Sequence, residues 1–94
     1  MQLEFEWHNA KADANLRAHG VSFDLAKTVF TDPFAIERLD DREDYGEARF
    51  VMIGLAEGNI LLFVAYSERE ERNRIISARR ATQDEQDDYF QQNA

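Results

Sequence analysis

Residues 49–67 read RFVMIGLAEGNILLFVAYS and give the strongest strand signals in the chain. Arg49–Leu55 and Ile60–Ser67 are rich in β-branched and aromatic residues, which favour the pleated, packed surface of a sheet. Between them, residues 56–59 include a glycine and an asparagine, which can adopt positive φ and close a hairpin. Because both strands are apolar on both faces, they are expected at the centre of a sheet that is covered on two sides.

Strand and helix signals precede this hairpin. Leu3–Trp7 alternates apolar and acidic residues, as a half-buried strand does. An alanine-rich helix is expected over Ala10–Ala18, with Asn9 as its N-cap and a glycine after its end. A second, short helix is expected to begin at Ser22 and to end before Pro33.

The remaining segments complete an α+β pattern. We expect a strand over Phe34–Leu39, a charged loop over Asp40–Gly46 and a further strand over residues 73–80. Thr82 is expected to cap a final helix. No repeat or linker divides the chain, so residues 1–94 are expected to form a single domain.

Arginines gather in the strand expected over residues 73–80, NRIISARR. Strand alternation puts Arg74 and Arg80 on one face and Arg79 on the other. Arginine is costly to bury and fills a core poorly, so this density favours an anionic partner such as phosphate or carboxylate. The alternative is a solvated strand end without a partner.

The pairing of strands decides which side chains gather on each face. The first hairpin is expected to pair Leu55 with Ile60. The second is expected to pair Ser67 with Asn73. One row across the sheet would then consist of Arg49, Tyr66 and Arg74. On the opposite face, where the glycine leaves room beside an arginine, the row would consist of Gly54, Leu61 and Arg79. A register slip of one residue would move these groups to the wrong faces.

A polar stripe is expected along the first helix, where Lys11, Asn15 and His19 recur at every fourth position. Ala12 and Leu16 would carry the core side. Such a stripe is ordinarily the solvated face of a helix. The functional interpretation is that a lysine charge, an amide and an imidazole titrating near neutrality lie beside a bound phosphate.

Glu47 and Arg49 project to the same side because a single residue separates them in a strand. One interpretation is an exposed salt bridge of little energetic value. The other is a carboxylate held near the arginines, where it can accept a proton.

Composition narrows the possible partners. The 94-residue chain has a formal net charge of −8, which argues against simple affinity for nucleic acid. Residues 69–80 nevertheless net +3, from five arginines against two glutamates, between acidic borders. This basic strip suits a short phosphate segment, an acidic protein or the acidic tail of the chain itself.

Other classes of site find little support in the composition. The chain has no cysteine and two histidines, so we expect no disulfide, no dedicated metal site and no cofactor. It has no apolar run long enough to span a bilayer and no signal-peptide pattern, which predicts a cytoplasmic protein without a membrane partner.

Three separated blocks of residues share their order and spacing with a known family. The first comprises Phe5-Glu6-Trp7, Lys11, Asn15 and His19-Gly20-Val21-Ser22-Phe23. The second comprises Gly46-Glu47, Arg49 and Gly54. The third comprises Arg74-Ile75-Ile76-Ser77-Ala78-Arg79-Arg80-Ala81-Thr82, Glu85 and Tyr89. In these blocks the chain resembles the BrnT toxins of bacterial type II toxin–antitoxin modules. It departs from them at His8, where an acidic helix cap is usual, and at Ala18, where a lysine is common.

The resemblance implies a fold and a partner. The implied fold is a RelE-like small domain of class α+β, with the order β-α-α-β-β-β-α, a mostly antiparallel sheet and helices packed on one side. The implied partner is a BrnA-type antitoxin that neutralises the toxin. DNA would be contacted only indirectly, through the antitoxin complex.

The resemblance also implies ribonuclease activity, so the leading hypothesis is a metal-independent RNA endonuclease that inhibits translation. Attack of the ribose 2′-OH on the adjacent phosphorus needs a proton acceptor, cations for the phosphoryl charge and a proton donor. Arg79 is the first candidate for stabilising the charge. The supporting cations would be Lys11, Arg49 and Arg80. The acid or base would be Glu47 or His19. The residues expected to bind RNA also include Arg74 and Tyr66, the latter by positioning or stacking on a base.

The alternative belongs to the binding class and follows from the acidity of the chain. In this interpretation the protein is a catalytically weak, partner-binding subunit that acts mainly in a toxin–antitoxin transcriptional repressor complex. A gene for a small antitoxin directly downstream, and growth arrest on expression of this chain alone, would distinguish the two hypotheses.

Overall fold

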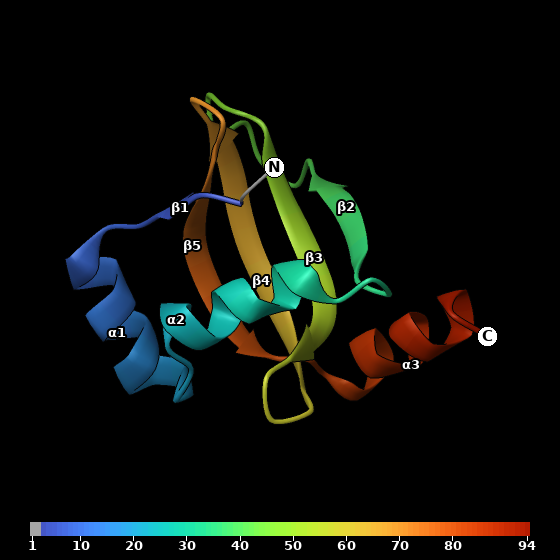
Figure 1. Cartoon of the computed structure of the whole chain (residues 1–94). Helices are drawn as coiled ribbons and strands as arrows, with labels where there is room; N and C mark the ends of the chain where they lie inside the picture. Colours follow the sequence, from blue (N-terminus) through green and yellow to red (C-terminus); the bar gives the residue numbers. More distant parts are fainter. Residues whose placement is uncertain (1–2) are drawn as a thin grey trace.

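The computed structural model describes residues 3–94, in which helices lie on both sides of a five-stranded sheet (Figure 1). The strands are β1 (Phe5–Glu6), β2 (Ile36–Asp40), β3 (Arg49–Ala56), β4 (Ile60–Arg69) and β5 (Arg72–Arg80). The helical segments are α1 (Asn9–His19), α2 (Phe23–Ala26), the 3₁₀ helix η1 (Lys27–Thr31) and α3 (Gln83–Gln92). The strand order is β1-β5-β4-β3-β2. β1 runs parallel to β5, and the other neighbouring pairs are antiparallel.

This architecture confirms the α+β class and the mostly antiparallel sheet. The element order β-α-α-β-β-β-α was one strand short, because four strands rather than three follow α2 and η1. β2 corresponds to the strand expected over Phe34–Leu39, which the implied element order left out, and it pairs along its whole length with β3.

The helices α1, α2 and η1 cover one face of the sheet, which we call the helix face (Figure 1). The fully buried residues that the helical half contributes are Val21, Phe23, Ala26 and Val29. The strand residues beneath them are Ala56, Leu62, Val64, Ile75 and Ala78. Burial of each large apolar side chain contributes roughly 1.5–3 kcal/mol, so this face supplies most of the core.

The helix α3 packs against the opposite face, and Figure 1 shows it at one end of the sheet, away from α1 and α2. Tyr89 of α3 and the preceding Ala81 pack there against Ile53 of β3. The resemblance implied helices on one side only, and this expectation is wrong for α3. The reason is that β3 and β4 carry apolar side chains on both faces, as the sequence indicated.

The first hairpin is registered one residue away from the expected pairing, because Leu55 faces Leu61 rather than Ile60. A three-residue loop closes it, and the last two loop residues have positive φ. The shift turns Tyr66 onto the helix face, where it is 1% exposed between two phenylalanine rings. Arg49 projects from the other face.

The strand β5 contains a β-bulge in which Ile76 is an extra residue. Before the bulge, Arg74 faces Ser67, and after it, Arg79 faces Phe63. The extra residue reverses the alternation of side chains, so Arg74 and Arg79 project from the same face. The expected alignment of Arg49 with Arg74 is confirmed, with Ser67 between them in place of Tyr66. The expected row of Gly54, Leu61 and Arg79 on the opposite face is wrong.

The side chain of Asn15 joins α1 to the edge of β5. Its amide donates to the carbonyl oxygen of Ala78 at 2.8 Å, and its Oδ1 accepts from the backbone N–H of Ala78 at 3.1 Å. The amide thus satisfies the strand edge as a neighbouring strand would, and it also donates to the carbonyl oxygen of Val21. Asn15 is buried rather than solvated, whereas Leu16, expected in the core, is 50% exposed.

Close contact between β3 and the segment after η1 depends on Gly54. A Cβ atom there would lie 2.7 Å from Cγ1 of Val29 and 3.0 Å from Cβ of Ala35. Gly54 therefore makes room for Val29 and Ala35 on the helix face. The expectation that it makes room beside Arg79 is wrong.

The substitution Gly54→Ala is expected to lower the free energy of unfolding by about 1–3 kcal/mol through overpacking. Urea denaturation monitored by circular dichroism measures the loss. The substitution Val29→Ala removes the closest contact, so in the double variant the two losses should be less than additive. Strictly additive losses would show that the added Cβ does not meet Val29.

The N-terminus of α1 offers a second test, because its N-cap is His8 rather than the expected Asn9. The His8 side chain makes no capping hydrogen bond, and the first turn contains no acidic residue. The substitution His8→Asp supplies an acceptor and a favourable charge, so it should raise the free energy of unfolding by about 1 kcal/mol. His8→Ala is the matched control and should leave the urea midpoint nearly unchanged.

Candidate ribonuclease site

Six arginines project from the sheet face opposite the helix face, and we call this surface the arginine face. It comprises Arg38, Arg49, Arg69, Arg72, Arg74 and Arg79. Arg49 and Arg74 flank Ser67 at one level of the sheet, and Arg79 flanks Phe63 at another. Four residues of β4 separate the two levels, or roughly 13 Å, a span that long arginine side chains can partly bridge.

The guanidinium of Arg79 is held from two directions. Its Nη1 and Nη2 donate to the two carboxylate oxygens of Glu85 at 2.8 and 2.9 Å. Its Cζ lies 4.2 Å from the centre of the Phe63 ring, a stacked cation–π contact. The side chain remains 35% exposed, so it is both fixed and accessible.

Arg49 has a similar environment at the other level. Its Cζ lies 4.0 Å over the ring of Tyr45, which belongs to the loop after β2. Its Nε lies 3.6 Å from a carboxylate oxygen of Glu47, which agrees with the expected proximity of these two residues. Each of the two arginines is thus stacked on an aromatic ring and accompanied by a carboxylate.

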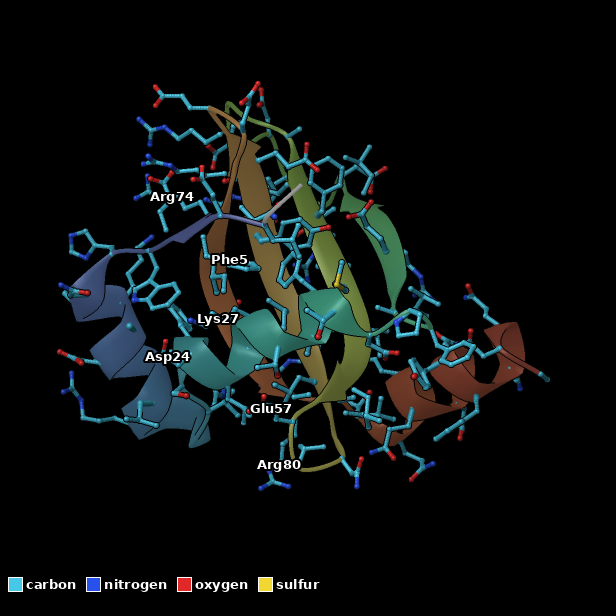
Figure 2. All side chains as sticks on the ribbon, in the orientation of Figure 1. Phe5, Asp24, Lys27, Glu57, Arg74 and Arg80 are labelled. Atoms are coloured by element: carbon cyan, nitrogen blue, oxygen red, sulfur yellow. The ribbon has the colours of Figure 1, made fainter. Side chains whose placement is uncertain are left out.

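The other arginines differ in their partners. Arg38 forms an exposed ion pair with Asp88 of α3 at 3.0 Å. Within residues 3–94, Arg74 and Arg80 form no ion pair. Figure 2 shows Arg74 near one end of β5 and Arg80 at the other. Arg80 faces Leu62, so it lies on the helix face of the sheet, apart from Arg79.

Tyr66 does not join the site. Its ring is buried on the helix face against Phe30 and Phe50, so an RNA base cannot reach it. The expected role of Tyr66 in positioning or stacking on a base is therefore wrong, because the register of the first hairpin differs by one residue.

Lys11 and His19 are exposed on α1, one turn before and one turn after Asn15. Asn15 faces the edge of β5, so the helical spacing turns Lys11 and His19 toward the same edge. They therefore flank the strand that carries Arg79 without lying on the arginine face.

Three neighbours of the two stacked arginines, Glu85, Phe63 and Tyr45, were not predicted as such from the sequence. Glu85 had a detectable signal, since Thr82 and Glu85 have the spacing of a capping box. Phe63 and Tyr45 had none, because cross-strand neighbours and loop contacts depend on the register and on the path of the loop after β2.

The carboxylate of Asp32 fixes α3 to the rest of the fold. It accepts from the backbone N–H groups of Leu55 and Phe34 and from the hydroxyl of Tyr89. Burial raises the pKa of Asp32, but these hydrogen bonds outweigh it and lower the pKa below its ordinary value. Burial and the hydrogen bond to Asp32 raise the pKa of Tyr89 to about 12.

Among residues 3–94, no group of three or more His, Asp or Glu side chains is arranged to hold a metal ion. None of the helices in that range is long and apolar enough to cross a membrane.

The fold has a counterpart of known structure. The crystal structure of the Brucella abortus ribonuclease toxin, BrnT, matches with a TM-score of 0.63 at 20% sequence identity. The match covers 87% of this chain and 100% of that one. No curated protein sequence matches the chain significantly.

The sequence also matches a family as a whole. Residues 7–85 match the family described as the ribonuclease toxin, BrnT, of type II toxin–antitoxin systems. The chain belongs to this family, which confirms the resemblance found in the sequence. It is accordingly a ribonuclease toxin, and its partner is an antitoxin.

The contact between Tyr89 and Asp32 generates a prediction for α3. Tyr89→Phe removes a hydrogen bond to a charged acceptor and should lower the free energy of unfolding by about 1.5–3 kcal/mol. Because the pKa of Tyr89 is raised from 10.0 to about 12, its contribution is complete below pH 10 and is lost as the pH rises through 12. Urea denaturation from pH 8 to pH 12 should show this alkaline loss in the wild type and a smaller one in Tyr89→Phe. Equal losses in both proteins would exclude Tyr89 as the source.

Proposed function

We propose that this toxin is a metal-independent RNA endonuclease whose chemistry takes place on the arginine face. The observation that carries the proposal is the environment of Arg49 and Arg79, each stacked on an aromatic ring beside a carboxylate. Preorganised cations of this kind stabilise charge that develops on phosphoryl oxygens in a transition state. Inhibition of translation would follow from cleavage of messenger RNA in the cytoplasm.

The proposed reaction is attack by a ribose 2′-OH on the adjacent phosphorus. A bond forms between the 2′-oxygen and phosphorus, and the bond from phosphorus to the 5′-oxygen breaks. The proton of the 2′-OH passes to a base, and an acid returns a proton to the 5′-oxygen. The products are a 2′,3′-cyclic phosphate and a 5′-OH.

Residue roles follow from position and chemistry. Arg79 stabilises the phosphoryl charge, and Arg49 supports it from the other level of the sheet. Glu47 is the preferred base because its carboxylate is accessible, with 40% of the side chain exposed, and lies beside Arg49. We assign contacts with the flanking phosphates and the leaving group to the remaining candidates, which are Lys11, His19, Arg74 and Arg80.

The antitoxin partner is proposed to be of the BrnA type and to cover the arginine face. Support comes from α3, which covers only the end of this face near Ile53 and leaves the level of Arg49 and Arg74 outside its contacts. Size-exclusion chromatography of the co-expressed pair should give one larger species. Elution of two separate proteins at micromolar concentration would contradict the proposal.

Incubation of the purified chain with total RNA in EDTA tests the activity directly. Cleavage should persist in EDTA, leave cyclic phosphate ends and stop when the antitoxin is added. The substitution Arg79→Ala should lower the rate on the order of 100-fold, the usual cost of one preorganised donor. Arg79→Lys keeps the charge without the bidentate fork and should restore only part of the rate.

The control for Arg79 is Lys27, an exposed cation of η1 paired with Asp24 on the helix face. Lys27→Ala removes the same charge and should leave cleavage unchanged. Circular dichroism of each variant separates lost chemistry from lost fold. A well-folded Arg79→Ala protein that cleaves RNA at the wild-type rate would remove Arg79 from the site.

A further inference from the structure

The guanidinium of Arg79 uses one edge for contacts within the protein. Nη1 donates to Oε1 of Glu85 at 2.8 Å and to the carbonyl oxygen of Arg80 at 3.1 Å. Nη2 donates to Oε2 of Glu85 at 2.9 Å. Both hydrogens of Nη1 and one hydrogen of Nη2 are therefore occupied.

The second edge of the guanidinium has no partner in the described part of the chain. Nε and the second hydrogen of Nη2 donate to no residue within 3–94. Nε is not buried, so a ligand can reach it. These two parallel N–H groups match the spacing of two oxygens of a phosphate. Phe63 supports the plane of the guanidinium and limits its rotation out of this orientation.

The carboxylate of Glu85 is itself fixed by the start of α3. Its Oε1 accepts from the backbone N–H of Thr82 at 2.9 Å, and the Thr82 hydroxyl accepts from the backbone N–H of Glu85 at 3.3 Å. This reciprocal pair is a capping box. Burial raises the pKa of Glu85, but the hydrogen bonds from Arg79 and Thr82 outweigh it and lower the pKa, so the carboxylate is ionised at neutral pH.

We infer that Glu85 is the positioning residue for Arg79: it holds the Nη edge so that the Nε edge meets the phosphodiester. The inference rests on the proposed function, and it adds the orientation of the guanidinium to it. The flexible arginine side chain is ordered when α3 folds, not when the substrate arrives. A competing possibility is that Glu85 blocks Arg79, in which case its removal would raise the rate of cleavage.

Two substitutions separate positioning from helix capping. Glu85→Gln keeps an oxygen for the N–H of Thr82, because glutamine also serves in capping boxes, but it puts an amide donor against Nη2 of Arg79. Thr82→Ala removes the hydroxyl of the capping box and leaves both oxygens of Glu85 for Arg79. Circular dichroism and urea denaturation report the stability of both variants.

The kinetic test is a double-mutant cycle on cleavage of a short RNA. Glu85→Gln should lower kcat roughly 10- to 100-fold with little change in KM, as expected for a misplaced group. Thr82→Ala should retain the wild-type kcat despite its lower stability. In an Arg79→Ala background, Glu85→Gln should cause no further loss. A faster Glu85→Gln enzyme, or an equal loss in both backgrounds, would overturn the inference.

A spectroscopic test does not depend on ribonuclease activity. An ordered Arg79 should give a resolved Nε–Hε signal in nitrogen-edited NMR, identified by its absence in Arg79→Ala. Titration with inorganic phosphate should shift this signal in the wild type and in Thr82→Ala, but not in Glu85→Gln. An unchanged phosphate response in Glu85→Gln would overturn the positioning role. Absence of RNA cleavage by the wild type would instead contradict the proposed function, and the phosphate titration would still decide the role of Glu85.

Discussion

The extra residue in β5 determines which face of the sheet carries Arg74 and Arg79. Without the bulge at Ile76, strict alternation would leave Arg74 and Arg79 on opposite faces, and one of them would point into the core beneath α1 and α2. The free-energy cost of burying an unpaired arginine in that core would exceed the stabilisation from the apolar packing around it. With the bulge, Ile75 and Ala78 lie in the core on the helix face, and both arginines project from the opposite face.

The arrangement of α3 follows from a second constraint, which is electrostatic. Asp32 gathers donors from β3, from the start of the η1–β2 connection and from Tyr89, so one carboxylate fixes three segments distant in sequence. Its position depends in turn on Gly54, whose missing side chain lets the η1–β2 connection approach β3. Tyr89 thus connects this carboxylate to α3, the helix whose first turn holds Glu85 against Arg79 on the other side of the sheet.

Most of the fold could be predicted from local patterns. The hairpin strands, the cap at Thr82 and the short helix at Ser22 were all recognised, because apolar periodicity and capping chemistry act over a few residues. The assignment of side chains to faces could not be predicted in the same way. It depended on a three-residue loop in one hairpin and a bulge in the other, and a shift of one residue moves every side chain of a strand to the opposite face.

In the candidate site, too, residue types could be predicted from the sequence, but their environments could not. The sequence identified Arg49, Arg74 and Arg79 as an unusual group of cations, and the structure brings them to one face. Tyr66 was misplaced by the register, and Asn15 was misread because a buried amide that satisfies a strand edge has the same sequence pattern as a solvated one. The predicted polar stripe on α1 therefore has the expected spacing, but its central residue, Asn15, is buried rather than solvated.

The pairing of arginines with carboxylates has a consequence for the way this enzyme meets its substrate. Each of Arg38, Arg49 and Arg79 has an acidic group within 4 Å, so at a distance these pairs act as dipoles rather than as separate positive charges. The remaining field is that of a protein with a net charge of −8, and salt screens it beyond about 8 Å at physiological ionic strength. RNA is therefore not drawn in by long-range steering of the kind that accelerates strongly basic nucleases. In the proposed site, recognition would begin only at contact, where the Nε edge of Arg79 meets a single phosphate.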